Sequence, residues 1–230
     1  MAALLAALLF LVARPGLGQS VDIDSTVAVC VARDTASHWR EVKARLAAGA
    51  ERPGTDSVLR SRLLELGARD QSLRAVPAII DSLQTSAAFR ERLTAADSTN
   101  AQELRRIVAE HGWPTWSLVG AEAASAAWAV AQHNPDLEEW ALRLIKALPP
   151  GEYSASDVAT MEDRVRVHKG LPQLYGTQLS TNSAGALVYD TIEDLEHVDA
   201  RRAELGMMPL STYSCIMRGV YGREVLPPGR

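Results

Sequence analysis

Two histidines occupy positions where an imidazole could exchange a proton with a substrate. His111 ends one helical pattern just before Gly112, and His133 ends an alanine-rich pattern just before another helix begins. Histidine titrates near neutral pH, so each residue is a candidate general acid or base. A simpler interpretation is that each imidazole caps a helix C-terminus, where the macrodipole favours positive charge. Both interpretations stay open at this stage.

The stretch GLPQLYGTQLS, residues 170–180, is unusually polar for an alanine-rich chain. A buried polar group without a hydrogen-bond partner costs about 1–3 kcal/mol. The loop must therefore be solvated, bonded to itself or facing a ligand. Its candidate ligand-binding side chains are those of Gln173, Tyr175, Thr177 and Gln178, which offer amides and hydroxyls.

The helical pattern before this loop, TMEDRVRVHKG, carries several charged residues. Arg164 and His168 share a helix face at i and i+4, and Asp163 precedes them. Such runs are usually solvated faces. Because the pattern leads directly into the polar loop, its last turn could instead line the same pocket.

The chain lacks the sequence signatures of several reaction classes. It contains no histidine pair with metal-ligand spacing, no GxSxG elbow and no phosphate-binding glycine loop. We therefore predict neither a metal ion nor a cofactor. The net charge of −4, with basic residues spread along the helices, argues against a nucleic-acid partner.

Helices must position these residues, because alanine and leucine are abundant and aromatic residues make up only 5%. The expected fold class is all-α, a single compact multi-helix domain with irregular or extended segments near 170–192. Apolar spacing and turn residues predict helices near 37–48, 57–77, 98–112, 118–133, 134–148, 154–168 and 195–205, and an extended stretch near 187–189. The run STVAVCVA fits either a strand or the start of the first helix.

Three of these helices carry recognisable N-terminal signals. Asn100 and Glu103 form a plausible capping box. Asn134 precedes a proline at the first helical position, and Ser154 opens the next helix.

The N-terminus, MAALLAALLFLVARPGLGQS, contains an apolar run too short for a stable membrane span. It suits a secretory signal over 1–18, followed by a single helical domain over 19–230. We thus expect an extracytoplasmic protein, periplasmic or secreted, with no stable membrane span after signal removal. A buried N-terminal helix is the alternative, since no Lys or Arg precedes the run.

The chain has two cysteines, Cys30 and Cys215. They could pair in an oxidising compartment, or they could be two unrelated buried thiols.

Five blocks of the sequence resemble a bacterial family catalogued as domain of unknown function 6624. They are LGARDQSLR, STNAQELRRIVAEHGWPTWSLVG, AAWAVAQH, DRVRVHKGLPQLYGTQ and EDLEHVDARRAELGMMPLSTY, which occur in this order within 66–213. The combination of HGWP with QLYGTQ is specific. The two cysteines fall outside the resembling region.

The resemblance implies a single polar site assembled from several helices. Beyond the residues above, the family pattern matches Asp70, Gln71, Arg74 and Trp113 as candidate ligand contacts, together with Arg201 and Arg202. It implies no mechanism.

Three functions remain open. An enzyme, a hydrolase or transferase acting on a small polar molecule, would use His111 or His133 as acid or base, with Asp163 orienting the imidazole. In that enzyme, Arg74 or Arg164 would bind an anionic group. A non-enzymatic module would bind a peptide, glycan or partner protein through the same residues. Alternatively, the polar blocks form an internal hydrogen-bond network that fixes helix packing.

Overall fold

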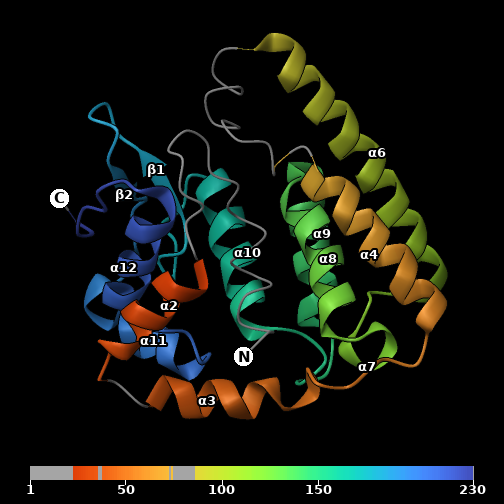
Figure 1. The fold of residues 1–230 in the computed structure, drawn as a ribbon, viewed down its shortest axis with the longest axis horizontal. Coiled ribbons are helices and arrows are strands. Elements are labelled where there is room, and N and C mark those ends of the chain that lie inside the picture. Colours follow the sequence, from red (N-terminus) through yellow and green to blue (C-terminus); the bar gives the residue numbers. More distant parts are fainter. Residues whose placement is uncertain (1–22, 36–37, 73, 75–85, 230) are drawn as a thin grey trace. The chain divides into compact units, whose positions relative to one another are not determined.

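A computed structural model describes residues 23–35, 38–72, 74 and 86–229, without the side chains of residues 23 and 24. The described residues form ten α-helices and one two-stranded sheet (Figure 1), which confirms the mostly α-helical fold class. The predicted signal over 1–18 lies outside the described residues. No helix in the described part of the chain is both long enough and apolar enough to cross a membrane.

The chain divides into two compact units, which are described separately. In the described part of the chain, unit 1 lies within Gly49–Tyr153, and unit 2 lies within Val21–Ala48 and Ser154–Arg230. In sequence, unit 1 is therefore inserted between the two segments of unit 2.

Unit 1 is a helical bundle around one alanine-rich helix. Its helices are α4 (Ser57–Ser72), α6 (Ala87–His111), α7 (Trp116–Val119), α8 (Ala121–Gln132) and α9 (Pro135–Lys146). Helix α8 packs against the other four. Small side chains permit this close packing, because a Cβ added to Gly67 of α4 would lie only 2.7 Å from the Cβ of Ala126. Leucine and isoleucine side chains of α4, α6 and α9 complete the buried core.

The structure corrects one helix boundary in unit 1. Helix α6 begins at Ala87 and is capped by Ser86, whose side chain accepts a hydrogen bond from the backbone N–H of Phe89. The predicted capping box is therefore wrong, and Asn100 is buried inside the helix. The polar run that suggested a cap lies partly on the exposed side of α6, where Ser98 and Thr99 face solvent.

The predicted start of α9 is confirmed. Asn134 is its N-cap residue in extended conformation, and Pro135 is the first helical residue. The Asn134 side chain makes no capping bond within α9, and its Nδ2 instead donates to the backbone carbonyl of Asp97 in α6 at 3.1 Å.

The described residues of unit 2 form five α-helices and the sheet. The helices are α2 (Ile23–Ala32), α3 (His38–Leu46), α10 (Ala155–His168), α11 (Val198–Glu204) and α12 (Leu210–Tyr221); the strands are β1 (Leu179–Thr181) and β2 (Leu187–Tyr189). The strands are antiparallel, with Ser180 opposite Val188. The run STVAVCVA is thus helical, the extended stretch near 187–189 is confirmed, and α12 was not expected.

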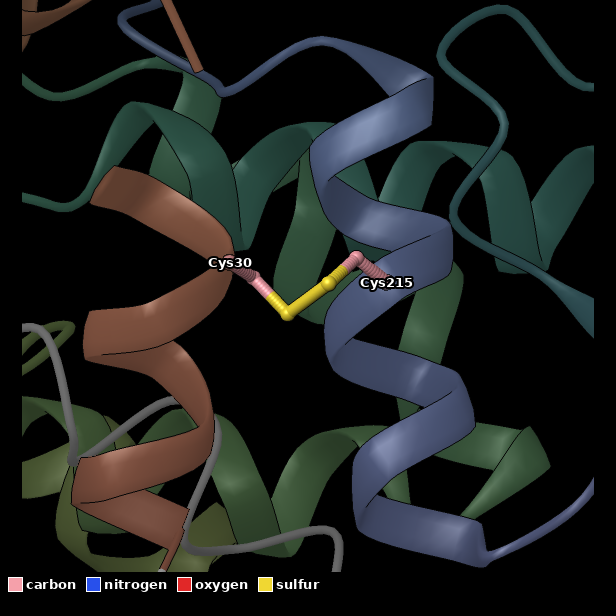
Figure 2. The surroundings of a disulfide bond; sticks show 2 residues. All are labelled: Cys30 and Cys215. Carbon is pink, nitrogen blue, oxygen red and sulfur yellow. A yellow bond between two sulfur atoms is a disulfide. The ribbon is translucent and has the colours of Figure 1, made fainter. Parts of the chain in front are cut away.

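A disulfide bond joins the two segments of unit 2. Cys30 of α2 and Cys215 of α12 are bonded across 185 residues of sequence, with their Cα atoms 5.8 Å apart (Figure 2). Helices α2 and α12 pack closely, because a Cβ added to Gly219 would overlap the methyl group of Thr26. Of the two interpretations of the cysteines, the structure supports pairing.

Candidate functional site

A buried aspartate holds a histidine in unit 1. Asp70 lies near the C-terminal end of α4, and His133 is the residue that ends α8. The Nδ1 atom of His133 lies 2.7 Å from Oδ2 of Asp70, and the two side chains are 13% and 1% exposed. Because an ionised carboxylate only accepts hydrogen bonds, Nδ1 carries the hydrogen. In the neutral imidazole the lone pair is then on the other ring nitrogen, Nε2, which lies 3.5 Å from Nε2 of the Gln132 side chain.

An arginine ties Asp70 to a second carboxylate on another helix. Nη1 of Arg74 donates to Oδ1 of Asp70 at 2.9 Å, while its Nη2 donates to Oδ1 of Asp97 in α6 at 2.7 Å. Gln71 adds a donor to Oδ2 of Asp70 at 2.7 Å. We refer to Asp70, Gln71, Arg74, Asp97 and His133 as the Asp70 cluster.

Asp97 is a member of this cluster that sequence reasoning missed. Its pKa is raised above the ordinary aspartate value, chiefly because burial penalises the charged form. The Arg74 guanidinium acts in the opposite direction, and the negative charge of Asp70 adds to the rise. Asp97 lies just before the helix predicted for residues 98–112, and no motif or spacing in the sequence singled it out.

The geometry shows what three of the predicted ligand-binding side chains contact. Arg74 was a candidate to bind an anionic group, yet its guanidinium is held between Asp70 and Asp97. Asp70 and Gln71, also candidate ligand contacts, bond to groups inside the cluster, and contact of these three residues with a ligand stays a prediction. Among the cluster side chains, His133 offers an imidazole nitrogen, Nε2, of the kind that suits proton transfer, with the Gln132 amide 3.5 Å away.

His111 lies far from this cluster. It ends α6, which carries Asp97 fourteen positions earlier, and a helical rise of 1.5 Å per residue separates the two by about 21 Å. Its Nε2 lies 3.7 Å from the carboxylate of Glu110. The two histidines of unit 1 therefore do not share a site.

Trp113 is part of the packed interior of unit 1. Its side chain is buried and meets the ring of Trp140 edge to face, with the ring centroids 6.0 Å apart. Such aromatic pairs stabilise cores. The structure thus gives Trp113 a packing role, and contact with a ligand stays a prediction.

In unit 2, Asp163 of α10 binds the backbone of the polar loop. Its Oδ1 accepts from the N–H groups of Leu174 and Tyr175 at 2.6 and 3.0 Å. Its Oδ2 accepts from the backbone N–H and the hydroxyl of Thr177 at 3.0 and 2.9 Å. Burial raises the pKa of Asp163, and these loop donors act in the opposite direction. Both oxygens are thus engaged by the loop, and a role for Asp163 in orienting a histidine stays a prediction.

The two glutamines of the loop are also engaged within unit 2. Gln173 is fully buried; its Nε2 donates to the carbonyls of Gln178 and Asp190, and its Oε1 accepts from the N–H of Gln178. Nε2 of Gln178 donates to the carbonyl of Thr160 and the hydroxyl of Thr177. The loop is polar largely because it bonds to itself and to α10.

Two arginines of α11 also bind the backbone of this loop. Arg202, which is 1% exposed, donates to the carbonyls of Tyr175 and Met208, each at 2.6 Å. Its guanidinium also lies over the ring of Tyr213, whose hydroxyl donates to the carbonyl of Thr177. Arg201 donates to the carbonyl of Leu174 at 3.0 Å.

Two candidate residues of unit 2 are less enclosed. Tyr175 is half-buried, and burial together with the charges of Glu162 and Asp163 raises the pKa of its hydroxyl. Arg164 is also half-buried, and its charge lowers the pKa of Tyr221, which burial raises. Contact of Tyr175 or Arg164 with a ligand stays a prediction.

The site residues predicted from the sequence thus fall into two groups. Unit 1 holds Asp70, Gln71, Arg74, His111, Trp113 and His133, of which four join the Asp70 cluster. Unit 2 holds the others, most of which form the loop network. Within the described part of the chain, no group of three or more His, Cys, Asp or Glu side chains could hold a metal ion.

Comparison with known proteins places the chain in a family. The model of the family of unknown function DUF6624 matches residues 57–226. The match extends beyond 66–213 at both ends, so it includes Cys215, which the sequence had placed outside, but not Cys30. Comparison with curated proteins and with solved structures found no match. The match covers well over half of the chain, which therefore belongs to the family of unknown function DUF6624.

Proposed function

We propose that the Asp70 cluster is the centre of a hydrolase or transferase in which His133 acts as the general base on a small polar molecule. The observation that carries this proposal is the 2.7 Å bond between Oδ2 of the buried Asp70 and Nδ1 of His133. A carboxylate in this position fixes the ring orientation and tautomer of a catalytic histidine.

In this proposal, Nε2 of His133 takes a proton from a water molecule or a hydroxyl group. The oxygen then forms a bond to an electrophilic carbon or phosphorus atom of the substrate. The resulting imidazolium is stabilised by Asp70, and it returns the proton to the leaving group. His133 is partly exposed, at 13%, whereas Asp70 is sealed from solvent at 1%.

A cap alone does not account for this arrangement. A histidine that only caps a helix C-terminus needs a charge near the last carbonyls and no buried partner. Burying a carboxylate is costly unless charged or hydrogen-bonding groups compensate for it. Here three donor atoms, one each from Gln71, Arg74 and His133, surround one side chain that is 1% exposed. A buried carboxylate that bonds directly to a histidine is an arrangement that functional sites use.

The experiment is a panel of chromogenic esters, phosphodiesters, glycosides and amides assayed with the wild type and with His133→Ala. We expect one class to be turned over and the variant to lose about 10²–10⁴-fold in kcat/KM, the usual contribution of a general base. His197→Ala is the matched control, because His197 contacts Asp194 at 2.9 Å in an exposed Asp–His pair of the same chemistry.

Turnover that His133→Ala retains would overturn the proposal. A ligand that the wild type and His133→Ala bind equally, without turnover, would favour a non-enzymatic binding module for a peptide, glycan or partner protein.

We also propose that the protein is exported and works outside the cytoplasm. The disulfide between Cys30 and Cys215 supports this, because disulfides persist mainly in oxidising compartments. The apolar run within 1–18 supports it independently as a signal. Finding the N-terminus of the mature protein, by mass spectrometry of an extracytoplasmic fraction, near residue 19 would agree; an intact cytoplasmic chain with free thiols would contradict it.

A further inference from the structure

We infer that Asp97 is a positioning residue of the Asp70 centre, acting on His133 through Arg74. The word "positioning" has functional meaning only if His133 is the base proposed above. The structural claim, that Asp97 sets the state of the His133 ring, can be tested without any substrate.

A continuous chain of charged hydrogen bonds links Asp97 to His133. Oδ1 of Asp97 accepts from Nη2 of Arg74 at 2.7 Å, and Nη1 of the same guanidinium donates to Oδ1 of Asp70 at 2.9 Å. The other oxygen of Asp70 accepts from Nδ1 of His133 at 2.7 Å. Because the guanidinium is planar and rigid, its two ends hold the carboxylates in a fixed relation.

A second connection runs through the backbone of Asp97. Its carbonyl accepts a hydrogen bond from Nδ2 of Asn134, the residue that follows His133, at 3.1 Å. Asp97 of α6 therefore contacts Arg74, which binds Asp70, and Asn134, which follows His133. One residue thus fixes both sides of the Asp70–His133 bond.

The chain of bonds has a specific consequence for the imidazole. Arg74 keeps Oδ1 of Asp70 engaged, so that Oδ2 is the oxygen that faces His133. If Asp97 loses its charge, Arg74 loses one of its two carboxylate partners and Asp70 gains freedom to rotate. The neutral ring then loses the constraint that keeps its hydrogen on Nδ1, and both tautomers become populated.

Imidazole ¹⁵N chemical shifts, recorded by long-range proton–nitrogen NMR above neutral pH, test the inference on the full-length protein. In the wild type we expect His133 to show a protonated Nδ1 and an unprotonated Nε2. In Asp97→Asn we expect the two shifts to move toward each other as the tautomers interconvert. The resonances are assigned by comparison with His133→Ala.

The matched control is Glu103→Gln. Glu103 lies on the same helix and accepts from Nε of Arg62 on α4 at 2.8 Å, so this variant also breaks an ion pair between α4 and α6. We expect it to leave the His133 shifts unchanged. Equal changes in both variants, or no change in Asp97→Asn, would overturn the inference.

The result separates this inference from the proposed function. Unchanged His133 shifts in Asp97→Asn, with activity lost in His133→Ala, would remove the positioning role and keep the base. Changed shifts with activity intact in His133→Ala would keep the structural role of Asp97 and remove the base. If Asp97→Asn fails to fold, Arg74→Lys replaces it, since lysine keeps the charge but cannot bridge two carboxylates with a planar fork.

Discussion

Two aspartate–histidine pairs of the protein have the same chemistry but differ in how exposed their side chains are. Both Asp70–His133 and Asp194–His197 bring a carboxylate within 3 Å of Nδ1 of an imidazole. The second pair is exposed, at 55% and 65%, and solvent screens it. Its hydrogen bond to His197 lowers the pKa of Asp194, as expected for a surface pair. The first pair is shielded from water, so it can hold one ring orientation.

In unit 2, the pKa values of Asp157 and Lys43 are shifted by burial, and the shift of Asp157 predicts how stability changes with pH. Burial raises the pKa of Asp157 in α10 to about 6, and burial lowers that of Lys43 in α3 to about 8. Each group attracts the other, but desolvation prevails for both. The folded protein therefore binds the Asp157 proton more tightly than the unfolded chain does.

We expect Asp157→Asn to gain stability relative to the wild type as pH rises. The Asp157 contribution to wild-type stability is greatest below the unfolded pKa of 3.8 and falls until pH about 6. The variant lacks this loss, so the difference in unfolding free energy should grow over that window, as measured by urea unfolding at several pH values. Asp194→Asn should show the opposite trend, because the pKa of Asp194 is lowered. A flat difference for Asp157→Asn would contradict the prediction.

At the scale of elements, the polar loop connects helices α10 and α11 of unit 2 through hydrogen bonds to its backbone. Asp163 of α10 and Arg202 of α11 together bind four backbone groups of the loop residues Leu174, Tyr175 and Thr177. For this block, the hypothesis of an internal hydrogen-bond network has the most direct support. The side chains bind loop backbone that would otherwise be buried without partners.

Asp163→Asn should destabilise unit 2 by about 3 kcal/mol, since the new amide group would face N–H donors that lose their acceptor. Denaturant unfolding followed by circular dichroism measures the change. Glu193→Gln is the control: it removes a surface ion pair with Arg166 and should change stability by less than about 1 kcal/mol. A loss for Asp163→Asn no larger than that of the control would contradict the structural role.

Local sequence signals predicted where several helices begin. The other helix start and the pairing of site residues depend on tertiary contacts, which the sequence pattern does not show. The Asn134–Pro135 start of α9 and the Ser154 start of α10 were predictable because their signals are local. The start of α6 was not, because burial of Asn100 depends on the neighbouring helices. The bond between Asp70 and His133 joins residues 63 positions apart, so the sequence supplied both candidates without their pairing.

At the scale of the whole molecule, unit 2 depends on two distant segments of the chain. Helices α2 and α3 precede unit 1 in the sequence, and the remainder of unit 2 follows it. The disulfide between α2 and α12 closes a loop that contains all of unit 1. This bond therefore restricts the unfolded chain over most of its length.

Replacing both Cys30 and Cys215 with serine should lower stability by about 5 kcal/mol, the chain-entropy cost for a loop of this length. Urea unfolding of the wild type with and without reductant gives the same comparison without mutation. Reductant should leave the double variant unchanged. Equal midpoints for the oxidised wild type and the double variant would show that the bond adds nothing to stability.

The family match begins at residue 57, after α2 and α3, so one cysteine of the disulfide lies before the matched region and the other lies inside it. A recombinant fragment cut at 57–226 would retain Cys215 and lose Cys30. Helix α12 would then lack the helix that packs on it and would carry an odd thiol. Such a fragment is prone to covalent dimerisation between molecules, whereas a product that starts before α2 keeps its cysteines paired within one chain.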